Sequence, residues 1–168
     1  VQTPEQLRAR FDLDVRPFSE ATAIDPDKKE VTVRSKDGEY QLAYDKVILS
    51  PGAKPFVPPA EGLSEAKNIF TMRNVPDVDA VTGFILEHKP KKAVVIGAGF
   101  IGLEMAESLA HRGLAVTIVE KAPHVLPPFD EEMAAYLADE LKANGVTLYT
   151  GVAATAFQNE GKTIVLEN

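Results

Sequence analysis

The feature that most constrains the fold is a glycine-rich stretch within Lys92–Glu107, which reads KAVVIGAGFIGLEMAE. An apolar run leads directly into Gly97 and Gly99, and Gly102 follows three residues later. Glycine destabilises a helix by about 1 kcal/mol relative to alanine, so three glycines at the start of a helix need another reason. The pattern predicts a strand, a tight turn and a helix whose first turn lets something approach its backbone.

The segments around this stretch alternate between strand and helix patterns. Ala93–Ile96 and Ala115–Glu120 are short apolar runs, as parallel strands covered on both faces contain. Between them, apolar residues spaced about four apart predict a helix over Ile101–His111. This order predicts an α/β fold with a parallel sheet. The other expected elements are a helix from Pro76, a helix capped by Asp130 and ended by Gly145, a third strand at Val146–Tyr149, and a hairpin of Ala153–Phe157 with Thr163–Leu166.

Each glycine has a mechanical reason to be there if the ligand is a dinucleotide. Gly97 permits the tight turn out of the strand, Gly99 lets the backbone approach a diphosphate, and Gly102 lets the helix pack close to the strand. We expect the main-chain amides of Ala98–Ile101 to be free to hold the diphosphate, assisted by the helix dipole. The alternative is a methyltransferase-like binder, which also uses a glycine-rich turn.

Two acidic residues near the glycines are candidates for coenzyme contacts. Glu120 ends the second strand, 18 residues after Gly102, where its carboxylate can accept both ribose hydroxyls of NAD. A carboxylate there repels a 2′-phosphate, so NADH is favoured over NADPH, although the neighbouring Lys121 would soften that preference. Glu104 has two interpretations: it complements the helix dipole, or it faces the nicotinamide end of the coenzyme.

Composition and charge narrow the function classes. The formal net charge is −7 with no basic block, so neither a nucleic-acid surface nor an anionic-membrane surface is expected. The chain has no cysteine, which excludes disulfides and a cysteine nucleophile within it, and its three histidines are too scattered for a metal site. The longest apolar run, Ala93–Leu103, is too short to span a bilayer. We expect a cytoplasmic protein.

The first fifty residues have strand patterns throughout. Ala21–Ile24 and Val31–Val33 predict a strand pair, and a turn at Gly38 predicts a third strand. Val47–Leu49 is a continuous apolar run, typical of a strand covered on both faces. Pro51–Gly62 contains four prolines and predicts an extended connector.

One short internal repeat links the two halves of the chain. The sequence Ala-Thr-Ala at 154–156 repeats the Ala-Thr-Ala at 21–23, and without a gap Ile164 and Leu166 then correspond to Val31 and Val33. Two interpretations remain open: a chance match between short strands, or two related domains.

Four longer segments carry a family resemblance. They are DKVILSPGAKPFVPPAEG at 45–62, IFTMRNVPDVDAV at 69–81, VVIGAGFIGLEMAESLAHRGLAVTIVE at 94–120 and VLPPFDEEMA at 125–134. In this order they resemble the FAD-dependent pyridine nucleotide-disulfide oxidoreductases, most of all the coenzyme A-disulfide reductase and NADH oxidase branch. The resemblance implies a Rossmann-like three-layer fold with a parallel sheet and a β-meander.

The resemblance also implies domains, cofactors and site residues. Residues 1–62 are expected to be the C-terminal half of a divided FAD-binding domain, and residues 63–168 an NAD(P)-binding domain that lacks its last strand. Arg73 matches a family arginine to which we assign no role. The implied NAD contacts are Gly97, Ala98, Gly99, Phe100, Ile101, Gly102, Glu104, Glu120 and Lys121, and the implied FAD contacts are Ser50, Pro51, Gly52 and Ala53.

The chain departs from the family pattern in what it lacks. The first glycine motif, which grips FAD, and the redox cysteine are absent. We therefore expect a piece of a longer protein, a homodimer whose remaining FAD domain completes the flavin site. The piece would bind NAD(P)H without turnover and contain no catalytic residue. The electron acceptor is left open between a disulfide, a persulfide and oxygen. A non-catalytic nucleotide-sensing module and an S-adenosylmethionine-dependent transferase are the alternative functions.

Overall fold

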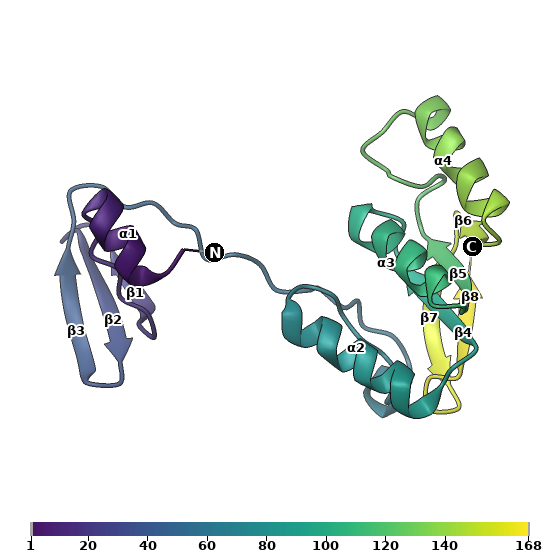
Figure 1. Ribbon diagram of the computed structural model, residues 1–168, viewed down its shortest axis with the longest axis horizontal. Coiled ribbons are helices and arrows are strands. Elements are labelled where there is room, and N and C mark those ends of the chain that lie inside the picture. The colour runs from purple at the N-terminus through teal and green to yellow at the C-terminus, as the bar shows by residue number, and fades with distance from the viewer. Residues whose placement is uncertain (1, 168) are drawn as a thin grey trace. The chain divides into compact units, whose positions relative to one another are not determined.

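The structure is a computed structural model that describes residues 2–167, and it contains two compact units (Figure 1). The first unit extends to Gly52 and the second begins at Ala53. The connector after Ala53 groups with the second unit because Glu61 bonds to a hairpin there. The N–H of Phe157 donates to the Glu61 carbonyl at 2.7 Å, and the N–H of Glu61 donates to the Thr155 carbonyl at 3.3 Å. The assignment of the two parts to FAD and NAD(P) domains stays a prediction.

The first unit contains one helix and one antiparallel sheet. The sheet has the order β1-β2-β3, as expected from the strand patterns. The helix α1 was not expected, and the prediction of strands throughout the first fifty residues is wrong there. Its signal lies in the sequence: Thr3 and Gln6 form a capping box, with Pro4 at the first helical position. The elements are α1 (Pro4–Phe11), β1 (Glu20–Asp25), β2 (Glu30–Ser35) and β3 (Gly38–Ala43).

The prediction of a buried strand at Val47–Leu49 is also wrong. These residues have no regular secondary structure, and the Ile48 side chain is 92% exposed. A strand must pair its main-chain N–H and C=O groups with a neighbouring strand. The sheet of the first unit consists of β1, β2 and β3, and within the described residues no further strand pairs with this segment. An apolar run alone therefore does not make a strand.

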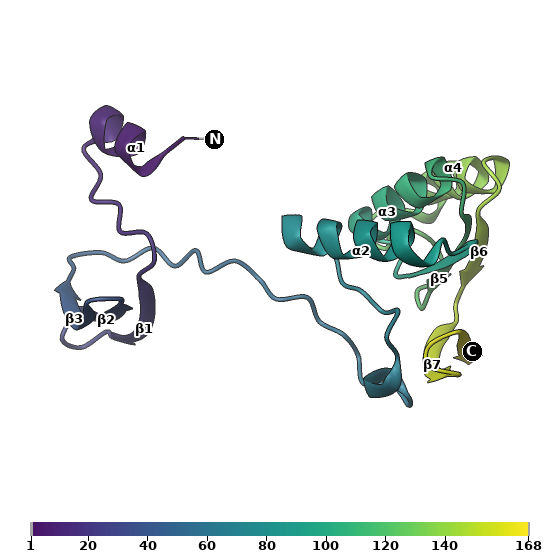
Figure 2. The same ribbon diagram turned by 60° about the horizontal axis from the view of Figure 1, so that its bottom comes forward.

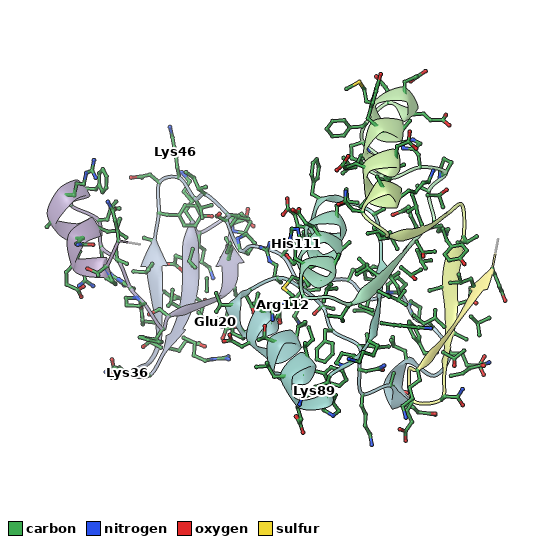
Figure 3. The ribbon with its side chains drawn as sticks, turned by 45° about the vertical axis from the view of Figure 1, so that its right-hand side comes forward. Glu20, Lys36, Lys46, Lys89, His111 and Arg112 are labelled. Atoms are coloured by element: carbon green, nitrogen blue, oxygen red, sulfur yellow. The ribbon has the colours of Figure 1, made fainter. Side chains whose placement is uncertain are left out.

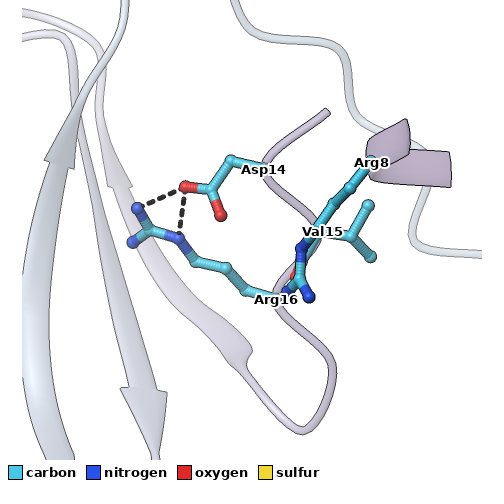
Figure 4. A network of polar contacts seen from close by, with 4 residues as sticks. All are labelled: Arg8, Asp14, Val15 and Arg16. Atoms are coloured by element: carbon cyan, nitrogen blue, oxygen red, sulfur yellow. Dashed lines mark hydrogen bonds and ion pairs between the residues drawn. The ribbon is translucent and has the colours of Figure 1, made fainter. Parts of the chain in front are cut away.

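Polar contacts join α1 to the segment that follows it (Figure 4). Arg16 donates from Nε and Nη2 to the Asp14 carboxylate at 2.8 and 2.6 Å, and Arg8 donates to the Val15 carbonyl. The hydrogen bond from Arg16 lowers the pKa of Asp14 below its usual range, and Arg16 likewise lowers the pKa of Tyr40. These contacts lie in an exposed segment whose apolar side chains Leu13 and Phe18 remain largely in water.

The second unit has the three layers that the resemblance implied. Figure 2 shows α3 and α4 on one side of the parallel sheet and the β7–β8 hairpin on the other. The parallel sheet has the order β4-β5-β6, so β5 lies in the middle. The α/β, Rossmann-like fold class is confirmed. The elements are η1 (Leu63–Glu65), α2 (Val75–His88), β4 (Lys92–Ile96), α3 (Phe100–His111), β5 (Ala115–Glu120), α4 (Glu131–Ala143), β6 (Thr147–Thr150), β7 (Ala153–Gln158) and β8 (Thr163–Glu167).

The core of the second unit is centred on β5. Val116, Ile118 and Val119 of this strand are buried, as a central parallel strand covered on both faces requires. Leu109 from α3 and Leu141 from α4 pack into the same cluster. The core therefore fixes the carboxyl end of β5, where Glu120 lies, against the helices of the unit.

The charged residues at the ends of α2 and α3 complement the helix dipole, with an acid at the start of α2 and basic residues at the end of both helices. Asn74 and Asp77 form a capping box at the start of α2, and the main-chain N–H of Arg73 also donates to Asp77. Figure 3 shows Lys89 at the end of α2 and His111 at the end of α3, so basic residues end both helices. At α4, Asp130 occupies the N-cap position, but its side chain makes no capping hydrogen bond, which corrects the expectation that it would.

The two hairpins β1–β2 and β7–β8 share their register and a bulge. Residue numbers in β7–β8 are 133 higher than in β1–β2, as Ala154 against Ala21 shows. Ala21 pairs with Val33 and Ala154 with Leu166, and the register shifts directly after each alanine. At this bulge the Thr22 hydroxyl donates to the Thr32 carbonyl at 3.3 Å and the Thr155 hydroxyl to the Val165 carbonyl at 3.5 Å. The shared bulge and hydrogen bond support related domains over a chance match.

Candidate nucleotide-binding site

The glycine turn joins β4 to α3 at the carboxyl end of the parallel sheet. Gly97 has a φ of +101°, which L side chains rarely adopt, so the prediction that it permits a tight turn is confirmed. Its N–H donates to the Val119 carbonyl at 2.8 Å, which holds the turn against β5. Gly99 is the N-cap residue of α3 and has extended backbone angles.

Gly102 lets α3 approach the turn closely. A Cβ on Gly102 would lie 2.0 Å from the Gly97 carbonyl oxygen and 3.4 Å from a Val95 methyl carbon. A contact of 2.0 Å with main chain is impossible without moving the helix, so the predicted close-packing role is confirmed. By contrast, a Cβ on Gly99 would meet no atom within 4 Å. The space in front of Gly99 is open on the side where we expect the phosphates.

The start of α3 offers main-chain donors to that open space. Within residues 2–167, no acceptor is assigned to the N–H groups of Gly99, Phe100, Ile101 and Gly102. The first N–H groups of any helix lack intrahelical partners and carry the positive end of the helix dipole. Such a set of adjacent donors fits an anionic diphosphate.

Ala98 differs from this expectation. Its N–H donates to Oε2 of Glu120 at 2.6 Å, and the residue is fully buried, so its amide is not free for a phosphate. The prediction of free amides therefore does not hold at Ala98. The other carboxylate oxygen of Glu120, Oε1, accepts from the N–H of Ala122 at 2.7 Å. A single carboxylate thus holds both the glycine turn and the loop after β5.

The loop between β5 and α4 packs against the glycine turn and bonds to the Ala98 carbonyl. The N–H of Leu126 donates to the Ala98 carbonyl at 2.9 Å, and Val125 is almost completely buried. Leu126 has a φ of +46° although it is not glycine, a conformation that costs about 1–2 kcal/mol. Sequence reasoning did not find this contact, because no local pattern marks a leucine for a positive φ.

Two other predicted residues lie at the exposed edge of the site. Glu104 is exposed, and α3 begins at Phe100, so Glu104 falls beyond the first turn and no acid occupies that turn. This weakens the helix-dipole interpretation of Glu104, since the dipole effect is confined to the first turn. Lys121 is exposed beside Glu120. Coenzyme contacts of both residues stay predictions.

The predicted FAD contacts lie in the connector between β3 and η1. Ser50, Pro51, Gly52 and Ala53 are all exposed and have no regular secondary structure, and Gly52 has a φ of +75°. These four residues span the boundary between the two compact units. Their contact with FAD stays a prediction. Among residues 2–167, no group of three or more acidic or histidine side chains is arranged to hold a metal ion. No helix among them has the length and apolarity needed to cross a membrane.

Comparison with known proteins identifies the family. The family model described as "Pyridine nucleotide-disulphide oxidoreductase" matches residues 5–168. The chain belongs to this family. This membership supports the oxidoreductase interpretation over the nucleotide-sensing module and the transferase.

Sequence and structure comparisons with individual members of this family support the assignment. The chain is 41% identical to an NADH oxidase of Methanocaldococcus jannaschii, over 87% of the chain and 33% of the relative. It is 38% identical to a coenzyme A disulfide reductase of Staphylococcus haemolyticus, over 86% of the chain and 32% of the relative. The crystal structure of reduced Bacillus anthracis CoADR-RHD superposes with a TM-score of 0.89 at 46% identity, over 99% of the chain and 30% of that structure. The chain thus spans about a third of these proteins.

Proposed function

We propose that this chain forms the nicotinamide-nucleotide-binding part of a flavin-dependent oxidoreductase. The observation that carries the proposal is the row of unpaired main-chain N–H groups at residues 99–102, in front of open space at Gly99. Glu120 lies beside this row, since it bonds to the adjacent Ala98 amide. Donors for a diphosphate next to an acceptor for a ribose are the two parts that a dinucleotide needs.

Each part of the coenzyme has a group that fits it. The N–H groups of Gly99, Phe100, Ile101 and Gly102 would hold the diphosphate. Glu120 would accept the adenosine ribose hydroxyls, because a carboxylate has about four lone-pair sites and two are used by Ala98 and Ala122. The same negative charge disfavours a 2′-phosphate, so NADH is the preferred coenzyme.

The complete protein would pass a hydride from NADH to FAD. FAD, when bound, supplies the hydride acceptor, and Ser50–Ala53 would contribute to its site. The proteins that this chain resembles are named NADH oxidase and coenzyme A disulfide reductase. The final electron acceptor would be oxygen, a disulfide or a persulfide, since an NAD-dependent persulfide reductase of A. fulgidus is also similar to this chain. This chain contains no cysteine, so it supplies no thiol for that step. The complete protein would act as a cytoplasmic homodimer, and this chain alone would bind coenzyme without turnover.

Isothermal titration calorimetry tests the binding proposal on the chain as it is. We expect NADH to bind, NADPH to bind more weakly and S-adenosylmethionine to give no heat. Heat with S-adenosylmethionine alone would replace the oxidoreductase proposal with the transferase. The absence of heat with either nicotinamide coenzyme at millimolar concentration would refute the proposal.

Two glycine variants separate binding from folding in the same experiment. Gly99→Ala places a methyl group in open space, so we expect an unchanged thermal midpoint but about tenfold weaker NADH binding. Gly102→Ala places a methyl group 2.0 Å from the Gly97 carbonyl oxygen, so we expect it to lower the thermal midpoint as well as NADH binding. Full NADH affinity in Gly99→Ala would show that the coenzyme does not approach this turn.

A further inference from the structure

We infer that Glu120 is a positioning residue that orders the glycine turn before any coenzyme arrives, in addition to its proposed contact with ribose. The inference rests on the proposed function only for its effect on coenzyme affinity. Oε2 of Glu120 lies 2.6 Å from the Ala98 nitrogen and Oε1 lies 2.7 Å from the Ala122 nitrogen. The carboxylate is therefore engaged with main chain on both of its oxygens.

Ala98 is a second point at which the turn is held, after the hydrogen bond from Gly97 to Val119. Its N–H donates to Glu120 and its carbonyl accepts from the N–H of Leu126 at 2.9 Å, so both of its polar main-chain groups have partners distant in sequence. Ala98 is fully buried, so water cannot replace a lost partner. A buried N–H without an acceptor is costly, and this cost forces the turn into the geometry that Glu120 permits.

The bonds of Glu120 also connect three parts of the site. Its side chain binds the turn after β4 and the loop after β5, and its carbonyl accepts from the N–H of Val152 at 3.2 Å. The neighbouring Ala122 carbonyl accepts from the N–H of Gly151 at 2.8 Å, at the end of β6. Glu120 thus lies where the carboxyl ends of all three parallel strands are joined. A residue in that place sets the spacing of the phosphate-binding amides that follow Ala98.

This role changes what a substitution at Glu120 should do. If the carboxylate only recognised ribose and repelled a 2′-phosphate, its neutralisation would weaken NADH and leave NADPH unchanged or tighter. If it also orders the turn, neutralisation weakens both coenzymes, because both place their diphosphate on the same amides. Glu120→Gln is the sharpest change, since glutamine keeps the shape but replaces one acceptor oxygen with a donor that faces an N–H group.

The test combines amide hydrogen exchange by NMR with calorimetry. Exchange at Ala98 is measured in the 168-residue chain without coenzyme, relative to exchange at the buried core residue Ile118. We expect Glu120→Gln to speed exchange at Ala98 about tenfold relative to Ile118, as the loss of one charged acceptor implies. Calorimetry should show weaker binding of both NADH and NADPH. The control is Glu107→Gln, an exposed glutamate on α3, which should change neither measurement.

The two readouts keep this inference separate from the proposed function. Unchanged relative exchange at Ala98 in Glu120→Gln would overturn the positioning role, and so would a loss of NADH affinity with NADPH affinity intact. If the unsubstituted chain bound neither coenzyme, the proposed function would fail while the exchange measurement still decided the role of Glu120 in the turn. Should Glu120→Gln not fold, Glu120→Asp carries the test: its shorter side chain should raise relative exchange at Ala98, and unchanged exchange would overturn the role.

Discussion

The hairpins β1–β2 and β7–β8 have the same register and the same threonine bulge, but they differ in burial. Ala156 and Phe157 in β7 are each 8% exposed, whereas their counterparts Ala23 and Ile24 in β1 are exposed, Ile24 at 38%. Only Val33 is buried in the first unit among the described residues. Matched local sequences have therefore produced matched main-chain geometry in unmatched environments.

The difference comes from what packs on each hairpin. In the second unit, Glu61 bonds to β7, and Asn68 donates to the Gly161 carbonyl at 3.0 Å in the β7–β8 turn. Gly62 lies so close that a Cβ there would be 1.9 Å from the Phe157 carbonyl oxygen. Within the described part of the first unit, no such segment is bonded to β1 on its open side. Local sequence thus sets register, and distant segments set burial.

The largest expected effect comes from replacing an apolar side chain by alanine at matched positions of the two hairpins. Phe157→Ala should lower the free energy of unfolding of the second unit by about 3–5 kcal/mol, because it leaves a cavity in packed surroundings. Ile24→Ala should cost about 1 kcal/mol, because Ile24 is already partly in water. Chemical denaturation, followed by amide exchange in each hairpin, measures both values. Equal costs would show that the burial difference carries no energy.

Most of the second unit could be predicted from sequence because its signals are local. The alternation of apolar strands with helices gave the parallel sheet, and the spacing of Gly97, Gly99 and Gly102 gave the turn and the close helix. Each of these features depends on residues within a few positions of one another. The family resemblance then supplied the cofactors, which no local pattern could.

The features that were not predicted correctly from the sequence are of two physical kinds. The helix α1 had a local signal in Thr3, Pro4 and Gln6 that the strand patterns around it obscured. The other misses are not local. The engaged amide of Ala98 depends on Glu120, a residue from the next strand. The unpaired run at Val47–Leu49 depends on whether a neighbouring strand exists. Sequence patterns do not report partners that lie far along the chain.

The next effect concerns the glycines beside the two hairpins. Gly62→Ala should lower the free energy of unfolding of the second unit by about 2–5 kcal/mol, since it adds a clash with Phe157 to the strain of a φ of +72°. Gly38→Ala, in the β2–β3 turn, has a φ of +121° but meets no atom within 4 Å, so only strain of about 1–3 kcal/mol is expected. Thermal unfolding of the two variants ranks them. A larger loss of stability in Gly38→Ala than in Gly62→Ala would mean that the connector does not pack closely against β7.

A smaller effect tests what the hairpins share. Thr22→Val and Thr155→Val each remove the hydroxyl that donates across the bulge, at a cost of about 0.5–1 kcal/mol. The control Thr147→Val, on an exposed strand position, measures the gain from valine's higher strand propensity. Residue-resolved amide exchange should show local opening at both bulges. An effect in only one hairpin would show that the bulges are held by different forces.

The smallest effect concerns acid, to which the hairpins should respond differently. The pKa of Asp25, in the β1–β2 turn, is lowered by hydrogen bonds from the main-chain N–H of Lys28 and by the Lys28 side chain. Its counterpart in β7–β8 is Gln158, which does not titrate. A lowered folded pKa contributes stability above the usual aspartate value of about 3.9, and that stability is lost as the pH falls through the folded pKa. As the pH falls from about 5 to about 2, β1–β2 should therefore open more readily than β7–β8. Amide exchange in each hairpin, measured over this pH range, detects the difference. Asp25→Asn should remove this difference, and a difference that persists in Asp25→Asn would assign the acid response to other groups such as Asp14.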